Sequence, residues 1–468
     1  MGKTARVPRI SLRTMPRMTA LLAAAAAGAI ALSGALPGNA APAPEPAGSA
    51  MPSDLATAFQ TAADQYDVPR EVLVGIGYAE SHLDGHNGQP SQSNGYGVMH
   101  LVSNPLNPTM SEAAKLTGMP VERLAKDTAA NITGAAAVLD AYADQAGLAG
   151  DARKDLAKWY PMIAKYSHSA DAPTGRLYTD EVYKIIGQGV GAAGVRTEPK
   201  PVNPDRGAYA KVAPLGTRTP ASIQAVDYPG AIWNAASTSN YRVGRTAAIS
   251  TIVIHVTQGS YAGTISWFKN PASQVSAHYV LRSSDGQVTQ MVAEKDTAWH
   301  VRSANPYTIG LEHEGFVDQP SWFTDAMYRS SAAVTRNIAD RRGIPKDRAH
   351  IRGHNEMPNN DHTDPGPNWN WTYYMQLVNG GNPPTYNFTT YGSGVRVRSD
   401  AKLTASIVTT LAGPTQVFVT CQKQGDPVTA EGTTNNWWSK LRDQGGYMTN
   451  IYIDHPAAQL PGVPICTS

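Results

Sequence analysis

A pair of potential metal ligands in one proline-containing segment constrains this chain more than any other feature. The segment HIRGHNEMPNNDHTDPGPNWNW, residues 350–371, places His354 and Asp364 ten positions apart, and its prolines argue against a helix. Upstream, His255 ends the apolar run of TIVIHVTQG. Two imidazoles and one carboxylate are a sufficient protein ligand set for catalytic zinc, with a fourth position open for water. The pattern predicts a metal-dependent hydrolase, although a histidine such as His255, taken alone, is more often a packed core residue.

The first forty residues predict an export signal. Five basic residues precede an Ala-rich apolar run, residues 20–36, and the small residues Gly38 and Ala40 suit a signal peptidase. A retained membrane anchor is the alternative, but the run is short and a proline follows it directly. We therefore expect removal of residues 1–40, a linker at residues 41–52, and a secreted protein without a stable membrane anchor.

The charge of the chain argues against nucleic acid as a partner, and its cysteine content suits an exported protein. The chain has 39 Lys and Arg residues and 37 Asp and Glu residues. The first forty residues hold five of the basic residues and none of the acidic ones. The remaining chain therefore carries 34 basic and 37 acidic groups, a net charge of −3. This balance is not the footprint of a nucleic-acid-binding protein. The two cysteines, Cys421 and Cys466, predict a disulfide that ties down the C-terminal tail of an exported protein.

Sequence periodicity predicts a multidomain fold. Residues 53–189 repeat apolar positions with helical spacing, and residues 190–227, rich in Pro, Gly and Thr, form a second linker. Residues 228–380 mix strand and helix patterns and predict an α/β domain with a central mixed sheet flanked by helices. Residues 386–468 hold short strands between turn residues and predict a small all-β barrel. The clearest α/β elements are the strand ISTIVIHV, the hairpin SAHYVLRSSDGQVTQMV, the strand IGLEHEG and the helix TDAMYRSSAAVTRNIADRRG.

The α/β region resembles one family over residues 228–379. The motifs that carry the resemblance follow the family's order: IVIHVT, SAHYVLRSSDGQVTQMV, TAWHV, NPYTIGLEHEG and GHNEMPNNDHTDPGPNWNW. They are similar to those of the type-2 N-acetylmuramoyl-L-alanine amidases, which are related to the bacteriophage amidases and the peptidoglycan recognition proteins. The resemblance implies hydrolysis of the amide that joins the lactyl group of N-acetylmuramic acid to L-alanine of the peptidoglycan stem peptide.

The same resemblance implies roles for individual residues. His255, His354 and Asp364 fall on the family's zinc-ligand positions, and zinc would activate water and polarise the scissile carbonyl. Glu312 falls on the catalytic carboxylate position, where it would carry a proton from water to the leaving amine. His362 falls where many members carry a catalytic lysine and others a histidine, and it would stabilise the oxyanion.

The sequence allows more than one role for several residues near these positions. Glu314 lies two positions beyond Glu312 and hence on the same face of a strand, so only the family register favours Glu312 as the catalytic carboxylate. Some histidines fall outside the implied metal triad and are expected to shape the groove or to pack locally: His278, His300, His313 and His350. Other side chains either line a sugar-peptide groove or belong to the core: Trp299, Asn305, Trp369 and Trp371.

The helical region resembles the lysozyme-like lytic transglycosylases. YDVPREVLVGIGYAESHLDGH and SNGYGVMHLVSNP carry the resemblance, which covers residues 54–186. It places Glu80 on the family's acid position, where a raised pKa would be needed to protonate a glycosidic oxygen. Two departures are His100, in place of the common glutamine, and AKYSHSA, in place of a Tyr-Asn turn. The alternative is that Glu80 caps a helix or forms an ion pair in a domain kept for glycan binding.

The C-terminal region resembles the bacterial Src-homology-3-like barrels of secreted wall enzymes. VRVRSD, LAGPTQV and GYMTNIYI carry this resemblance, which implies binding to wall peptide or glycan, with Trp437 and Trp438 as binding or core residues. Together the regions predict a secreted or wall-associated zinc amidase that acts on peptidoglycan. The alternatives are a peptidoglycan-binding protein without turnover, a bifunctional enzyme that also cleaves glycan strands through Glu80, and an amidase for another N-acyl substrate.

Overall fold

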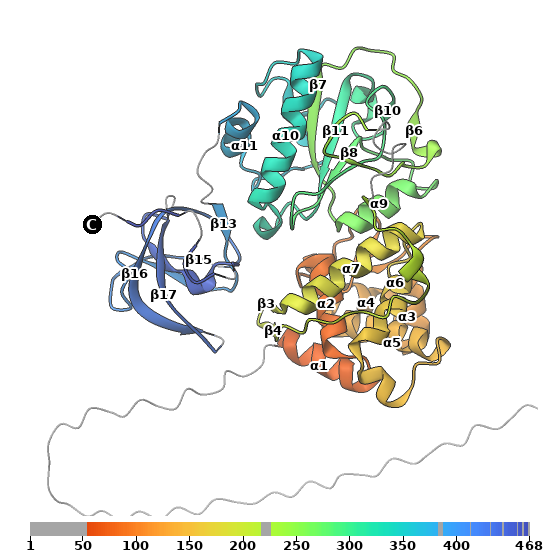
Figure 1. The fold of residues 1–468 in the computed structure, drawn as a ribbon, viewed down its shortest axis with the longest axis vertical. Coiled ribbons are helices and arrows are strands. Elements are labelled where there is room, and N and C mark those ends of the chain that lie inside the picture. Colours follow the sequence, from red (N-terminus) through yellow and green to blue (C-terminus); the bar gives the residue numbers. More distant parts are fainter. Residues whose placement is uncertain are drawn as a thin grey trace, which may run out of the picture. The chain divides into compact units, whose positions relative to one another are not determined.

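The computed structural model describes residues 54–216, 226–381, 387–411, 413–430, 432–441, 444–455, 457–460 and 463–466. The predicted signal and first linker lie outside these residues. The described residues all belong to one compact unit (Figure 1). Within them, no helix has both the length and the apolar character needed to cross a bilayer.

The described residues up to 188 form a helical region around one long buried helix. The helices are α1 (Asp54–Tyr66), α2 (Arg70–Ser81), α3 (Thr109–Thr117), α4 (Val121–Lys126), α5 (Thr128–Gln145), α6 (Tyr160–Tyr166) and α7 (Ala172–Gln188). A short antiparallel pair lies between α2 and α3: β1 (Gly95–Tyr96) and β2 (Leu101–Val102). Helix α5 is rich in alanine, so α1, α3, α4 and α6 can approach it closely. Asp127 begins α5 by accepting a hydrogen bond from the backbone N–H of Ala130.

Part of the segment predicted as the second linker packs on these helices. Strands β3 (Val190–Ala192) and β4 (Val195–Thr197) form an antiparallel hairpin next to α2. Val190 and Val195 are buried in the same core as the helices. The ordered helical region therefore continues beyond residue 189, because two valines near the start of this Gly- and Pro-rich segment have apolar partners.

A six-stranded mixed sheet forms the centre of the α/β region (Figure 1). Its strands are β5 (Ile232–Trp233), β7 (Thr251–Val256), β8 (Tyr279–Leu281), β9 (Val288–Gln290), β11 (Thr308–His313) and β12 (Ile351–Gly353). Their order is β12-β7-β11-β8-β9-β5; only β8 and β9 pair antiparallel. A separate short pair joins β6 (Tyr241–Arg242) to β10 (Thr297–Ala298). The strands and the hairpin expected from the sequence are confirmed.

Helices cover both faces of this sheet. They are α9 (Tyr261–Lys269), α10 (Asp325–Arg342) and α11 (Trp371–Val378). Ile252 and Ile254 of β7 share a core with α10 and α11, whereas Val280 of β8 packs with α9 on the other face. Because side chains alternate along a strand, His255 points away from the α10 and α11 layer. Helix α10 ends at Gly343, as predicted, and this glycine has a left-handed φ of 66°.

The C-terminal region is a curled sheet in which every strand pair is antiparallel. Its strands are β13 (Asn387–Thr389), β14 (Val395–Arg398), β15 (Ile407–Leu411), β16 (Gln416–Ala430), β17 (Thr433–Leu441) and β18 (Tyr447–Thr449). They follow the order β13-β16-β17-β18-β14-β15 around a small core that includes Val397, Val417 and Met448. Trp438 is fully buried and Trp437 is half-buried.

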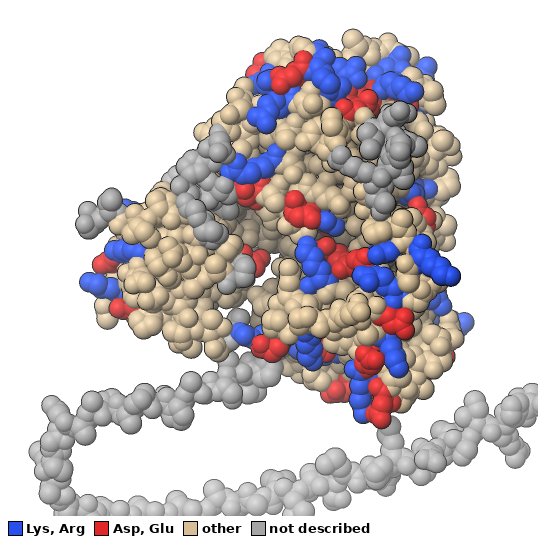
Figure 2. Space-filling model, in the orientation of Figure 1, with Lys and Arg blue, Asp and Glu red and all other residues tan. Residues whose placement is uncertain are grey.

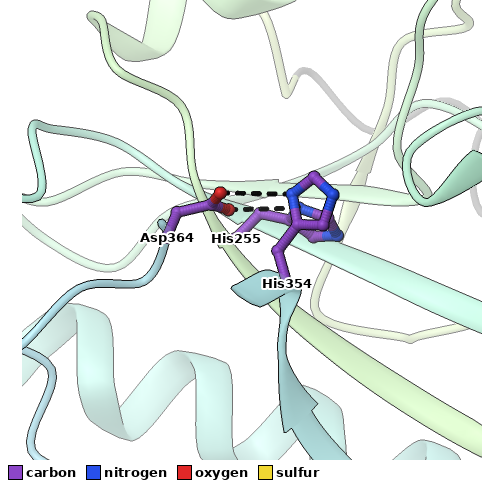
Figure 3. Close-up of side chains that lie close together, drawn as sticks. All are labelled: His255, His354 and Asp364. Atoms are coloured by element: carbon purple, nitrogen blue, oxygen red, sulfur yellow. Dashed lines mark hydrogen bonds and ion pairs between the residues drawn. The ribbon is translucent and has the colours of Figure 1, made fainter. Parts of the chain in front are cut away.

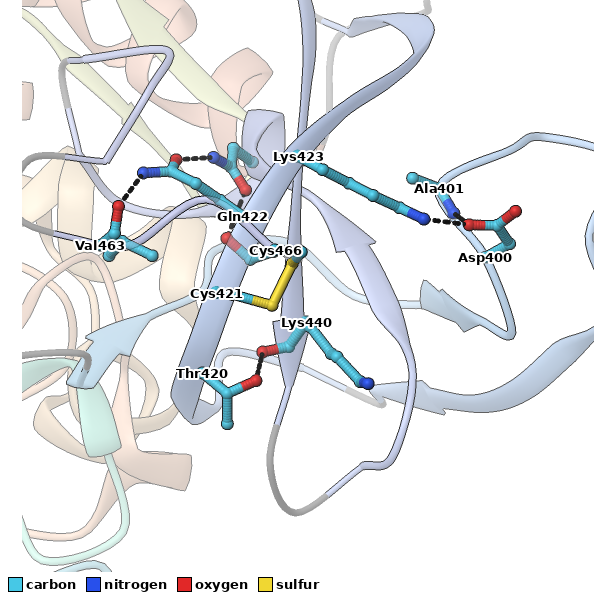
Figure 4. Close-up of a disulfide and its surroundings, with 11 residues drawn as sticks. Asp400, Ala401, Thr420, Cys421, Gln422, Lys423, Lys440, Val463 and Cys466 are labelled. Atoms are coloured by element: carbon cyan, nitrogen blue, oxygen red, sulfur yellow. Dashed lines mark hydrogen bonds and ion pairs between the residues drawn. A yellow bond between two sulfur atoms is a disulfide. The ribbon is translucent and has the colours of Figure 1, made fainter. Parts of the chain in front are cut away.

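The predicted disulfide between Cys421 and Cys466 is present (Figure 4). It joins β16 to the last described segment of the chain. Gln422, beside it, is fully buried, and its side-chain amide donates to the carbonyls of Leu460 and Val463 at 2.7 and 3.0 Å. The amide N–H of Cys466 donates to the carbonyl of Gln422 at 2.9 Å. A covalent bond and a buried hydrogen-bond network therefore hold the C-terminal segment to the sheet.

The distribution of charged side chains on the face drawn in Figure 2 agrees with the nearly balanced composition. On the face drawn in Figure 2, basic and acidic side chains are interspersed over the helical and α/β regions.

Candidate metal centre and active site

Three neighbouring parallel strands bring the site residues to one edge of the sheet. His255 lies near the carboxyl end of β7, Glu312 lies near that of β11, and His354 follows β12 directly. Glu312 is the register partner of His255, so both side chains lie on the same face. The carboxyl edge of a parallel sheet is a common place for a ligand site, because several strands deliver side chains to one point there.

A folded loop brings Asp364 back to His354. The backbone N–H of Asn355 donates to the carbonyl of Asp364 at 2.9 Å. The side-chain amide of Asn360 donates to the carbonyl of His354 at 2.7 Å, and its oxygen accepts the N–H of His362 at 3.0 Å. The Asn360 side chain therefore connects the two ends of the loop and stabilises its fold. No sequence pattern distinguishes this asparagine from its neighbour Asn359.

Three ligand atoms converge at this point (Figure 3). The Nδ1 atoms of His255 and His354 are 3.0 Å apart. The two carboxylate oxygens of Asp364 lie 3.3 Å from His255 Nδ1 and 3.1 Å from His354 Nδ1. Ligand atoms at about 2.0–2.1 Å from a tetrahedral zinc ion would lie roughly 3.3 Å from one another. The three residues therefore fit a zinc ion in chemistry and in spacing.

Burial and charge prepare these groups to bind a cation. Burial and, to a smaller extent, the neighbouring His354 lower the pKa of His255 to about 4, against the opposing effect of Asp364. Burial alone would raise the pKa of Asp364, but the neighbouring imidazoles of His255, His354 and His362 hold it well below its usual range. Neutral imidazole and ionised carboxylate are the forms that bind a metal.

The structure gives Glu312 and Glu314 different surroundings. Glu312 Oε1 lies 4.0 Å from His255 Nδ1, and its Oε2 is buried without a hydrogen-bond partner. Burial, and then the charge of Asp364, raise its pKa well above the usual value. Glu314 instead accepts the backbone N–H groups of Tyr261 and Ser283 at 2.7 and 2.8 Å. Glu312 faces the ligand atoms, whereas Glu314 holds two segments of backbone together.

His362 lies at the rim of the same group. Its ring stacks on His354 with centroids 4.2 Å apart, and its Nδ1 is 3.6 Å from Asp364 Oδ1. A hydrogen bond with Asp364 raises its pKa, against the opposing effect of burial. With about half of its side chain exposed, His362 can meet a ligand without leaving its position.

A cavity of about 800 Å³ opens over the three ligand atoms. Glu312 and His362 line it, together with Trp299, Asn305 and Arg302. Trp369 is 3% exposed and packs in the core, where it contacts Trp371. Four side chains were expected either to line a groove or to belong to the core. Trp299 and Asn305 line the cavity. Trp369 and Trp371 instead belong to the core that includes α10 and α11.

Comparison with known proteins agrees with this geometry. The sequence model of a family described as N-acetylmuramoyl-L-alanine amidase matches residues 245–367. N-acetylmuramoyl-L-alanine amidase A of Achromobacter lyticus is 42% identical over 174 residues, which cover 34% of this chain and 98% of that protein. The chain belongs to the N-acetylmuramoyl-L-alanine amidase family. We call residues 226–381, which hold the six-stranded sheet, the amidase region.

More distant relatives match shorter parts of the chain. The 1,6-anhydro-N-acetylmuramyl-L-alanine amidase AmpD of Escherichia coli is 34% identical over 113 residues, 22% of this chain and 59% of AmpD, so the match spans less than two thirds of that relative. A crystal structure of a selenomethionine derivative of AmpD has a TM-score of 0.28 and 26% identity, covering 32% of this chain and 96% of that one.

The remaining histidines of the amidase region have protein partners. His313 is fully buried between the carbonyl of His255 and the hydroxyl of Ser331, each at 2.7 Å. His278 is fully buried, and its Nε2 lies 2.6 Å from Nη2 of Arg245. His350 is half-exposed and pairs with Asp347 at 2.7 Å. His300 contacts His255 directly, which the sequence pattern did not indicate.

The structure places Glu80 in a separate, small pocket. Glu80 is 6% exposed at the end of α2, and its Oε2 accepts a hydrogen bond from the hydroxyl of Ser260 at 2.9 Å. His100 Nδ1 is 3.3 Å from the same oxygen. Ser260 also begins α9 of the amidase region by accepting the N–H of Gly263. The adjoining cavity measures about 50 Å³.

Proposed function

We propose that this chain is a secreted, zinc-dependent peptidoglycan hydrolase that cleaves the amide between N-acetylmuramic acid and L-alanine. The observation that carries the proposal is the convergence of three buried ligand atoms beside the unpartnered Glu312 carboxylate. A cavity of about 800 Å³ lies in the range of roughly 300–1,000 Å³ that small-ligand sites usually have. Family membership supports the amide as the bond that is cleaved.

His255, His354 and Asp364 would hold the zinc ion, which would supply Lewis acidity toward the scissile carbonyl and the attacking water. Glu312 would accept a proton from that water and deliver it to the leaving amine. A dication nearby favours ionised Glu312, because opposite charge lowers the pKa of a carboxyl group. His362 would donate a hydrogen bond to the oxyanion from the rim of the cavity.

Mass analysis of digested peptidoglycan tests this proposal. We expect free stem peptides that begin with L-alanine, loss of this release with a chelator, and its return with added zinc. Release that persists under the chelator would contradict the metal-dependent reaction. A zinc-loaded chain that binds peptidoglycan and releases nothing would support the alternative of a binding protein without turnover.

For the helical region, we propose a lysozyme-like fold that binds glycan without cleaving it. A cavity of about 50 Å³ beside Glu80 is far smaller than a sugar-binding subsite requires, and Ser260 already contacts the carboxylate. This observation counts against glycan cleavage at Glu80, and so against the bifunctional alternative; the proposed binding role rests on the sequence resemblance. Reducing ends or anhydro-sugars released from purified glycan strands by the full chain, and lost in Glu80→Gln, would reverse the preference.

For the C-terminal region, we propose a Src-homology-3-like barrel that binds the cell wall. Its all-antiparallel sheet and the half-buried Trp437 support this role. The disulfide supports export, since such bonds persist in oxidising compartments. Deletion after Asn382 should weaken wall pull-down and leave cleavage of a small soluble substrate intact. Recovery of a secreted chain that starts at Ala41 would test the signal.

A further inference from the structure

A line of polar contacts runs from the buried His255, through the half-buried His300 at the cavity wall, to the buried Thr308. His255 Nε2 lies 2.9 Å from His300 Nδ1. His300 Nε2 lies 3.1 Å from the hydroxyl oxygen of Thr308, which is fully buried. The same hydroxyl lies 3.0 Å from the backbone carbonyl of Ala304. Each contact is at hydrogen-bond distance, so the protons must be arranged to satisfy all three.

With both imidazoles neutral, only one arrangement of protons makes each of these three contacts a hydrogen bond. The carbonyl of Ala304 can only accept, so the single hydroxyl proton of Thr308 points to it. Thr308 must then accept from His300, which places the ring proton of neutral His300 on Nε2. His300 Nδ1 is therefore an acceptor, and His255 must donate to it from Nε2. Neutral His255 is left with a bare lone pair on Nδ1, the atom that faces His354 and Asp364.

Two further features hold the His300 ring in this line. The side-chain oxygen of Asn305 accepts the backbone N–H groups of His300 and Val301 at 3.0 and 2.7 Å. The ring packs on the backbone of β11 at Gly310, where an added Cβ would lie only 2.6 Å from His300 Nδ1. Any side chain at position 310 would therefore push the ring away from His255. The ring position is set by the fold and does not depend on a ligand.

We infer that His300 and Thr308 are positioning residues that fix the tautomer of His255 and so prepare its Nδ1 to bind the metal. The inference rests on the metal site of the proposed function. Without the line of acceptors, His255 can also carry its proton on Nδ1, where it would exclude the metal. An outer-shell partner of this kind typically contributes about 10- to 100-fold to metal affinity.

Matched variants of the full chain test this inference through zinc binding. His300→Leu removes the acceptor for His255, whereas His300→Asn keeps an oxygen close to the position of Nδ1. We expect titration of the metal-free chain with zinc to show affinity about 10- to 100-fold lower in His300→Leu, with substantial recovery in His300→Asn. Thr308→Val should weaken binding by a smaller factor, and Thr308→Ser should restore it, because serine keeps the hydroxyl.

Nitrogen-15 NMR of the histidine side chains reads the tautomer directly in the metal-free chain. We expect His255 to carry its proton on Nε2 in the unaltered chain, and a mixture of Nε2 and Nδ1 forms in Thr308→Val. Protonation of His255 on Nδ1 in the unaltered chain would overturn the inference. Equal zinc affinity in His300→Leu, His300→Asn and the unaltered chain would also overturn it. Failure of amide hydrolysis alone would instead count against the proposed function, because neither measurement uses turnover.

Discussion

Glu312 and Glu80 are both buried carboxylates, but they differ in their hydrogen-bond partners and in the size of the cavity beside them. Glu312 has an oxygen without a hydrogen-bond partner and lines a cavity of about 800 Å³ beside three ligand atoms. Glu80 accepts a hydrogen bond from Ser260, contacts His100 and adjoins a cavity of about 50 Å³. A carboxylate can act on a ligand only where the ligand can reach it.

The comparison shows why sequence resemblance alone could not assign both residues. Sequence resemblance predicts a catalytic position for each, and each is buried as a catalytic acid or base often is. The difference comes from Ser260, which belongs to another region of the chain and carries no motif. Variants at the two sites can show whether the large cavity is the site of reaction and whether the small pocket takes no part in it.

The largest effect is expected at the metal centre. Asp364→Ala removes one of three ligands and leaves two imidazoles without their anionic partner, so zinc binding and amide cleavage should both be lost. We expect activity to fall by about 1,000-fold or more. Asp340→Ala, which removes a surface ion pair with Lys346, is the matched control and should keep both. Retained cleavage with no bound zinc would refute the metal mechanism.

The next largest effect is expected at Glu312. Glu312→Gln keeps the size of the side chain but removes the base, so turnover should fall by roughly 100- to 10,000-fold while zinc still binds. The rate of muropeptide release and the zinc content of the same preparation are the two measurements. Full activity in this variant would mean that another group carries the proton.

The sequence predicted the strands, the helix ending at Gly343 and the disulfide because each has a local signal. Periodic apolar residues, a terminal glycine and a pair of cysteines in a chain with a predicted export signal can all be recognised without knowing the fold. It could not separate Glu312 from Glu314, because alternation along a strand places both on one face. The structure separates them through Tyr261 and Ser283, whose backbone N–H groups bind Glu314 from distant segments.

The roles of His300, Asn360 and Ser260 were inaccessible for the same reason. Each acts through hydrogen bonds that include at least one partner brought near by the fold, and no spacing rule connects it to that partner. The hairpin β3–β4 was hidden by composition, because a segment rich in glycine and proline predicts a linker. Two buried valines there contribute more than the composition suggests.

Glu314 offers a test through stability instead of turnover. Burial raises its pKa to about 7, against the opposing effect of the N–H groups of Tyr261 and Ser283. A carboxyl with a raised pKa stabilises the fold fully below its ordinary pKa, and that contribution is lost as pH rises toward 7. Relative to Glu314→Gln, the unaltered chain should therefore lose about 3 kcal/mol of unfolding free energy between pH 4 and pH 8. Parallel pH profiles for the two chains would contradict this.

The smallest effect is expected at Glu80, where the comparison predicts almost no change in amide cleavage. Glu80→Gln keeps an oxygen that can accept from Ser260, so the contact with α9 should survive and stability should change by only about 1 kcal/mol. Muropeptide release should stay within about twofold of the unaltered chain, in contrast to the large loss in Glu312→Gln. A comparable loss in both variants would show that the small pocket takes part in the reaction, and that Ser260 must release Glu80 when peptidoglycan binds.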